Sequence, residues 1–569
     1  MNTRVIVLLS ILIFLLAACS VTPQTTINYD PATLRFDGQR AYTIENEFVT
    51  KFPYRASGMP NNRLAAAWLQ EQFIRSGWTC TIDEWTVINY SKPVPLRNVV
   101  CRLPGTSSRE IVVVAHHDQS PLTVQGADND GSGIAILLHL GEIFGSEEKL
   151  PYTLVFVASD GEEYGMLGSK RFVDTHPDPS YMIAGFSLDQ LGKGFFNGLD
   201  MDARGQFSKI GQLWLQLLTV DSARAAGLWP AKVRAPLDQV TDQAVPISFM
   251  DEGPLVSAGV PAIGLTGLKP VRYAALHWQI YHSPLDTMEY QSSEALYQFG
   301  RMTEAVIRQL MTMTSFPSES GPYLYFENSR QVLRGAPLWS IFIGLVALFF
   351  LGAIFAGGVD LKDKISQWRS VMPHFLGLWL PLVASISLLY LFVAVGLMDK
   401  YALYPATTKD PETLNPHWPA VILFLAGLVV FLWLGRQIAR SLGKKLPAPQ
   451  PGAIKSFALF IVGLAAVFVL ATNPFSLLFF IPLLFWLLIG VREGAGRWLD
   501  ILFLISGGAI VYILIYMLGF VIQQMGFAVF WYILLMFSIG MVGFLTVLAT
   551  TAILAAGLTM VVRSPVRMV

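Results

Sequence analysis

Five short signatures between residues 115 and 287 carry the side chains that could do chemistry. In chain order they are Ala-His-His-Asp (115–118), Gly-Ala-Asp-Asn-Asp-Gly-Ser-Gly (126–133), Asp-Gly-Glu-Glu (160–163), Ser-Leu-Asp-Gln (187–190) and Tyr-His-Ser-Pro-Leu-Asp-Thr (281–287). They supply histidine nitrogens and carboxylate oxygens, the ligand types that a pair of hydrolytic metal ions uses. The pattern predicts a metallohydrolase site.

Hydrophobic runs that read as buried strands come shortly before these signatures. Ile111–Ala115 precedes the first, and Thr153–Ala158 precedes the third. In an open α/β sheet, ligands gather at the carboxyl ends of the strands, so the scattered positions are expected to converge on one pocket. Helical patterns such as Ser132–Phe144 alternate with the strands. This alternation predicts an α/β fold with a doubly wound mixed sheet flanked by helices.

The motifs and their spacing resemble the co-catalytic zinc exopeptidase family, which contains bacterial leucyl and lysyl aminopeptidases and glutamate carboxypeptidase II. The resemblance covers residues 35–312, which we expect to be the catalytic domain. Besides the signatures above, it rests on Phe36–Ala41, Asn98–Val100, Pro104-Gly105, Gly161–Ser169, Gly259–Ile263 and His282–Pro284.

The resemblance implies a role for each candidate residue. His116 and Asp189 would hold one zinc ion, and Glu163 with His282 the other. Glu162 would be the general base that takes a proton from the water shared by two ions and passes it to the leaving amine. Because Co²⁺ or Mn²⁺ can occupy similar ligands, zinc itself is part of the inference.

Two aspartates are expected to support these groups. Asp118 lies two residues after His116, so in an extended segment it points to the same side and could orient that imidazole. Asp251, in Met250-Asp251-Glu252-Gly253-Pro254, resembles a family segment that borders the substrate pocket.

One position departs from the family pattern. The family's bridging carboxylate is an aspartate four residues before the closing glycine, here Gly133, and that position is Asn129. An asparagine brings an oxygen but no charge, which makes two dications harder to hold together. Three outcomes stay open: Asp128 or Asp130 replaces it, Asn129 bridges weakly, or the site holds one metal or none.

These residues predict a metallo-exopeptidase, an aminopeptidase more than a carboxypeptidase, that attacks the peptide carbonyl with a metal-bound hydroxide. We find no arginine cluster that would capture a C-terminal carboxylate. Two alternatives remain. Asn129 favours a non-catalytic binding or scaffold protein with a peptidase fold. A single-zinc acyltransferase such as a glutaminyl cyclase is disfavoured because His116 would then have little purpose.

The composition divides the 569-residue chain into two parts. Hydrophobic residues make up 53% of it, more than in an ordinary soluble protein, and the excess lies beyond residue 335. The formal net charge is zero and the sequence has no basic stripe, so nucleic acid is not an expected partner. The expected partners are a peptide substrate and a lipid bilayer. The sequence does not predict an oligomeric state.

The N-terminus is typical of a bacterial secretion signal. Arg4, the apolar run Val5–Leu16 and the tetrapeptide Leu16-Ala17-Ala18-Cys19 resemble a lipoprotein signal over residues 1–19, with Cys19 lipidated. The alternative is an uncleaved N-terminal helix. Residues 20–34 are polar and are expected to form a tether.

Two further cysteines could pair outside the cytoplasm. Cys80 and Cys101 lie on predicted strands Thr79–Val87 and Leu96–Arg102, which could form a hairpin and allow a disulfide. The alternative is a pair of buried free thiols, because sequence does not show whether their Cα atoms approach.

After a linker over 313–337, residues 338–569 predict an all-α membrane domain. Seven apolar runs have spanning length: 338–358, 374–398, 418–435, 455–472, 474–491, 499–522 and 527–549. Lys and Arg concentrate in the loops that would be cytoplasmic if the catalytic domain is outside. This predicts a multi-pass protein of a bacterial cytoplasmic membrane with an extracytoplasmic catalytic domain and a cytoplasmic C-terminus. The final stretch, Phe527–Val562, is longer than one span needs, and an eighth span packed as a tight hairpin is the alternative.

Overall fold

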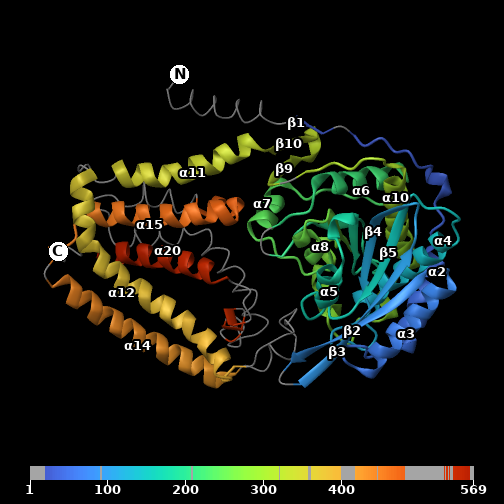
Figure 1. Ribbon diagram of the computed structural model, residues 1–569, viewed down its shortest axis with the longest axis horizontal. Helices are drawn as coiled ribbons and strands as arrows, with labels where there is room; N and C mark the ends of the chain where they lie inside the picture. Colours follow the sequence, from blue (N-terminus) through green and yellow to red (C-terminus); the bar gives the residue numbers. More distant parts are fainter. Residues whose placement is uncertain are drawn as a thin grey trace. The chain divides into compact units, whose positions relative to one another are not determined.

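The computed structural model describes residues 20–22, 24–89, 92–206, 209–319, 321–355, 361–398, 417–444, 446–480, 531, 534–535, 537–538 and 543–563 (Figure 1). The chain divides into two compact units, and the division falls between Gly335 and Ala336. The predicted signal peptide, including Cys19, lies outside the described residues.

A seven-stranded mixed sheet forms the centre of the first unit, in the order β2-β3-β5-β4-β6-β8-β7 (Figure 1). The strands are β2(Thr79–Asn89), β3(Lys92–Leu103), β4(Ser107–His116), β5(Tyr152–Ser159), β6(Met182–Leu188), β7(Leu199–Asp202) and β8(Ala262–Gly267). Strands β5, β4, β6 and β8 are parallel, whereas β2, β3 and β7 join antiparallel at the two sides. The predicted mixed α/β sheet is confirmed.

Helices cover both faces of this sheet. They are α2(Gly38–Lys51), α3(Pro60–Arg75), α4(Ser132–Gly145), α5(Leu167–Thr175), α6(Leu213–Ala225), α7(Pro236–Ala244), α8(Glu252–Ala258), α9(Ala274–Ile280) and α10(Ser293–Thr312). The short helical turns are η1(Pro31–Thr33), η2(Ala127–Gly131), η3(Pro179–Tyr181), η4(Val271–Tyr273), η5(Met288–Tyr290) and η6(Glu327–Ser329).

Strand β4 is an unbroken apolar run because both of its faces are buried. Val113 packs into the core that also contains residues of α2, α3, α4 and α10, whereas Val112 and Val114 pack with α5 and α8. A parallel strand with helices on both faces has no solvent side, so it lacks the polar alternation of an exposed sheet. The apolar run therefore ends only where the strand reaches His116.

The segment 20–34, expected as a tether, is packed against the first unit. Strand β1(Ser20–Val21) pairs with β10(Gln331–Arg334), which in turn pairs with β9(Tyr323–Phe326). The backbone N–H of Thr25 donates to Asp221 at 2.9 Å, and Tyr29 is buried. The expected linker 313–337 thus contributes two of these strands. Strand β1 forms by pairing with β10, which is about 310 residues away in the sequence. A local sequence pattern cannot predict such a pairing.

Cys80 and Cys101 lie directly opposite each other on β2 and β3. They form a disulfide with their Cα atoms 4.1 Å apart. The bond joins the edge strand of the sheet to its neighbour, and Cys101 is fully buried.

The second unit is helical. Its elements are α11(Ala336–Phe355), α12(Leu361–Ala394), α14(Trp418–Gly443), α15(Pro451–Thr472), η7(Pro474–Phe479) and α20(Phe544–Arg563). Among the described residues, four helices are long and apolar enough to cross a membrane: Ala336–Ile354, Ile365–Ala394, Trp418–Gly443 and Gly452–Thr472. They overlap the first four predicted runs. The run 499–522, most of 474–491 and about half of 527–549 lie outside the described residues.

Candidate metal centre

The predicted site residues come from neighbouring parallel strands at one edge of the sheet. His116 is the last residue of β4, Glu162 and Glu163 follow the end of β5, and Asp189 directly follows β6. Because these strands are parallel, their carboxyl ends meet at the same edge. All four side chains are buried. The structure therefore brings together the residues that the strand pattern pointed to.

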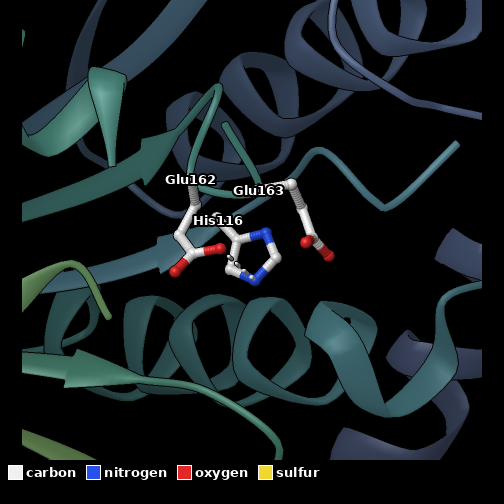
Figure 2. A group of neighbouring side chains, drawn as sticks. All are labelled: His116, Glu162 and Glu163. Atoms are coloured by element: carbon white, nitrogen blue, oxygen red, sulfur yellow. Dashed lines mark ion pairs between the residues drawn. The ribbon is translucent and has the colours of Figure 1, made fainter. Parts of the chain in front are cut away.

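Oxygen atoms surround Nε2 of His116 on three sides. Asn129 Oδ1 lies 3.0 Å away, Glu162 Oε2 3.7 Å and Asp189 Oδ1 3.9 Å. In Figure 2 the carboxylate of Glu162 is directed at the imidazole, and Glu163 lies on the other side of the ring. One ligand atom from each of His116, Glu162 and Glu163 lies within 4.8 Å of the others.

Asn129 lies between this group and a second one. Its Nδ2 donates to Glu163 Oε1 at 2.8 Å and contacts His282 Nε2 at 3.0 Å. Glu163 Oε2 is itself 2.7 Å from His282 Nε2. The carboxamide thus occupies the position expected for a bridging group, with its oxygen toward His116 and its nitrogen toward Glu163 and His282.

The neighbouring aspartates are directed elsewhere. Asp128 pairs with the buried Lys193 and accepts the Gly192 N–H at 3.0 Å. Asp130 accepts the backbone N–H of Gly133 at 2.9 Å and that of His116 at 3.3 Å. Of the three residues considered for the bridging position, Asn129 is the one whose side chain contacts His116, Glu163 and His282.

Gly133 is required by the position of Asp130. A Cβ atom at residue 133 would lie 2.3 Å from an Asp130 carboxylate oxygen. Real Cβ atoms do not approach oxygen so closely, so the motif closes with the residue that has no side chain. The glycine thereby lets Asp130 cap the first turn of α4 with a buried carboxylate.

Asp118 connects the His116 side chain to the Glu162-Glu163 turn. Its Oδ1 is 3.3 Å from His116 Nδ1 and accepts the Glu162 N–H at 3.3 Å, while Oδ2 accepts the Glu163 N–H at 3.4 Å. Burial alone would raise the pKa of Asp118, but the contact with His116 outweighs burial and leaves the pKa below its usual value. Asp118 thus lies beside Nδ1 of His116, and its orienting role stays a prediction.

His282 reaches the site through an unusual backbone conformation. Its φ is 50°, in the left-handed region, which costs a residue other than glycine about 1–2 kcal/mol. The ring stacks on Tyr281 with their centroids 3.9 Å apart. The stacking and the contact with Glu163 hold the imidazole in this orientation.

Asp251 is buried next to the strand end that leads to Glu162. Its carboxylate accepts a hydrogen bond from Ser159, the last residue of β5. Burial raises the pKa of Asp251 to about 6. His117, which follows His116, is also buried, and burial lowers its pKa to about 4, so its ring is neutral.

Three supporting residues carry weak or no sequence signals. Asp286 accepts the backbone N–H of Asp128 at 2.9 Å and of Asn129 at 3.2 Å. Arg55, in the loop after α2, donates from Nε to the His117 carbonyl at 2.9 Å. Lys193 is fully buried and pairs with Asp128. Lys193 could have been found from the sequence, because it lies four residues after the candidate ligand Asp189 at the end of β6. No sequence pattern pointed to Arg55.

The side chains at this site fit a divalent cation. Among the described residues, Asp189 Oδ1 is buried and accepts no hydrogen bond, a costly state for a carboxylate oxygen unless a cation faces it. Imidazole nitrogen and carboxylate oxygen are the ligands of catalytic zinc. The fold is that of the zinc exopeptidases, and the clustered side chains form a possible metal site.

Comparison with known proteins agrees with this class. The sequence model of Peptidase family M28 matches residues 98–307, which lie within the globular unit of the chain. The alkaline phosphatase isozyme conversion protein of Escherichia coli (strain K12) is 28% identical over 189 residues, covering 28% of this chain and 54% of that protein. Leucine aminopeptidase 1 of Ajellomyces capsulatus (strain H88) is 31% identical over 181 residues, covering 29% and 46%.

Among solved structures, glutaminyl cyclase from Porphyromonas gingivalis aligns with a TM-score of 0.42 and 22% identity, covering 48% of this chain and 99% of that one. The chain spans about half the length of the curated relatives it matches.

Proposed function

We propose that this chain is a membrane-anchored, zinc-dependent exopeptidase that removes residues from the free amino end of peptides. The observation that carries the proposal is the position of Glu162, whose Oε2 lies 3.7 Å from Nε2 of the candidate ligand His116. A carboxylate next to a metal ligand can exchange a proton with a water molecule and with the substrate.

The candidate ligands form two groups, His116 with Asp189 and Glu163 with His282, and Asn129 lies between them. A zinc ion in such a site polarises the scissile carbonyl and lowers the pKa of water.

The roles of the protein groups follow from their contacts. Glu162 takes the proton of the attacking water on Oε2 and passes it to the nitrogen of the leaving amine. Asp118 positions both Glu162, through its N–H, and His116, through Nδ1. Because Glu162 and His116 are buried, little bulk water competes for their hydrogen bonds, and electrostatic interactions with the substrate are strong.

Two observations support an aminopeptidase over a carboxypeptidase. A carboxypeptidase needs a cation that receives the substrate carboxylate. Arg55, which contacts the backbone of His117, has its guanidinium bound by the carbonyls of His117 and Gly126 and by Gln119. In addition, one similar protein is named a leucine aminopeptidase.

A location outside the bacterial cytoplasm is the second part of the proposal. Four helices of spanning length follow the globular unit, and the positive charges of the membrane portion favour an external globular unit. The Cys80–Cys101 disulfide is of the kind that persists in oxidising compartments. We further propose that Cys19 is lipidated after removal of residues 1–18, as its tetrapeptide suggests.

The test compares four substrates on the full chain purified in detergent. They are leucyl-arylamide, its N-acetylated form, an N-acetylated dipeptide with a free carboxylate, and glutaminyl-arylamide. We expect release of arylamine from the first and none from the second, because the free amine is needed. Cleavage of only the third would identify a carboxypeptidase, and cyclisation of the fourth an acyltransferase. No reaction with any of them by a folded chain would favour the non-catalytic alternative.

A further inference from the structure

We propose that this centre holds a single metal ion, bound by His116, Asp189 and Oδ1 of Asn129, and that the Asn129 amide nitrogen takes the place of a second ion. The inference rests on the proposed metallopeptidase function. It concerns which half of the site binds metal and why the other half does not.

The half around His116 has the spacing of a metal site. Ligand atoms about 2.0–2.2 Å from a tetrahedral zinc ion lie roughly 3.3–3.6 Å from each other. His116 Nε2 is 3.0 Å from Asn129 Oδ1 and 3.9 Å from Asp189 Oδ1, values on either side of that range. Glu162 Oε2, at 3.7 Å from the same nitrogen, faces the remaining position. Binding an ion here would lengthen the 3.0 Å contact and shorten the 3.9 Å one, each by a few tenths of an ångström.

The half around Glu163 and His282 is closed by direct contacts. Glu163 Oε2 and His282 Nε2 are 2.7 Å apart, which lies further below the spacing of two ligands of one ion than the 3.0 Å pair in the other half. Asn129 Nδ2 adds contacts of 2.8 Å to Glu163 Oε1 and 3.0 Å to His282 Nε2. These two side chains therefore face a polar N–H group where an ion would have to lie.

An amide nitrogen cannot replace a carboxylate oxygen as a ligand. Its two hydrogens are donors, and it offers no lone pair to a cation. The opposite orientation of the carboxamide would place Oδ1 against Glu163 Oε1, so two acceptors would face each other. The negative charge of Glu163 thus fixes which end of Asn129 faces each half of the site.

The surrounding turn prevents a neighbour from supplying the missing charge. Asp286 holds the backbone N–H groups of both Asp128 and Asn129. The Asp128 carboxylate is paired with buried Lys193, and the Asp130 carboxylate is bound by the N–H of Gly133. Moving either carboxylate into the site would break buried hydrogen bonds, and for Asp128 it would also leave a buried lysine unpaired.

The experiment is a count of bound zinc, independent of hydrolysis. The full chain in detergent is stripped with a chelator, loaded with excess zinc, desalted and analysed for metal and protein. We expect one equivalent in the wild type and two in Asn129→Asp, because the restored carboxylate can bridge. Asp189→Asn is expected to lose the single ion, whereas His282→Asn is expected to keep it. Circular dichroism and the unfolding midpoint show whether each variant is folded.

Each outcome decides between the claims. Two equivalents in the wild type would overturn this inference and leave the proposed metallopeptidase intact. If the single equivalent of zinc is lost in His282→Asn but kept in Asp189→Asn, the ion lies in the half formed by Glu163 and His282. That result would also overturn this inference. No zinc in a folded wild-type chain would overturn both the inference and the proposed function. If Asn129→Asp does not fold, the Asp189 and His282 variants still decide the position of the ion.

Discussion

Asp118 lies 3.3 Å from Nδ1 of His116 and, through the same oxygen, accepts the backbone N–H of Glu162. One buried carboxylate thus holds both a candidate ligand and the candidate general base. When a cation binds, this contact favours the tautomer that carries the proton on Nδ1 and presents Nε2 to the ion.

We therefore predict that Asp118→Asn weakens zinc binding about 10–100-fold, the usual effect of removing such a supporting group. The change is nearly isosteric, so the fold should persist. A zinc-binding titration of the wild type and the variant measures the effect directly. The variant Asp174→Asn, at an exposed site on α5, is the matched control and should bind zinc as the wild type does. Unchanged zinc affinity in Asp118→Asn would show that the contact with His116 has no orienting role.

Glu162→Gln should abolish the proton transfer and retain the metal. General acid–base catalysis contributes typically 10²–10⁴-fold, so we expect kcat to fall by about that factor with a smaller change in KM. Steady-state kinetics with leucyl-arylamide, together with metal analysis of the same preparation, makes the comparison. Loss of bound zinc in this variant would instead identify Glu162 as a ligand, and unchanged kcat would remove it from the mechanism.

The disulfide between Cys80 and Cys101 should stabilise the globular unit without affecting catalysis. It closes a loop with a sequence separation of 21, for which chain-entropy arguments give about 3 kcal/mol. We expect the double variant Cys80→Ala/Cys101→Ala to unfold at lower urea concentration, measured by pulse proteolysis, while its kcat stays within about 2-fold. Adding a reductant should destabilise the wild type and leave the double variant unchanged. A reductant effect on both would point to another cause.

Glu142 should stabilise the folded globular unit at neutral pH and lose this effect in acid. Burial alone would raise its pKa, but hydrogen bonds with His139 and Arg40 outweigh burial and lower the pKa to about 2. Because the pKa is depressed in the folded state, the stabilisation is complete above the ordinary value of 4.5 and is lost as the pH falls toward 2. The side chain is about one-third exposed, so we expect Glu142→Gln to cost only about 1 kcal/mol at pH 7.

Unfolding midpoints at pH 7 and pH 3 test whether the stabilisation by Glu142 is lost as the pH falls. The difference between Glu142→Gln and the wild type should shrink at the lower pH. Glu71→Gln removes an exposed ion pair with Arg75 and serves as the control, with a small effect at both values. A difference that grows toward acid pH would contradict the assignment.

The fold and family could be predicted because the relevant information is local. Buried parallel strands such as β4 read as unbroken apolar runs, and His116, Glu163 and Asp189 lie at or shortly after the ends of three of them. The direction of the Asn129 carboxamide could not be predicted. It depends on Asp286 and Glu163, which lie 157 and 34 residues further along the chain.

The packing of residues 20–34 shows the same limit. Ser20 pairs with Val332 from the other end of the globular unit, and a two-residue strand leaves no periodic pattern. A polar composition therefore predicted a free tether where the structure has an ordered strand and several buried side chains. Local patterns identify elements that are long enough to show a hydrophobic period. They do not identify short strands that form only by pairing with a distant segment.

The most direct test of the central claim is the dependence of hydrolysis on zinc. The full chain in detergent is stripped of metal and assayed with leucyl-arylamide while zinc is added in fractions of an equivalent. We predict no hydrolysis by the stripped chain and full recovery at one equivalent, with Glu162→Gln inactive throughout. Hydrolysis that persists without metal, or that is unaffected by Glu162→Gln, would contradict a metallopeptidase at this site.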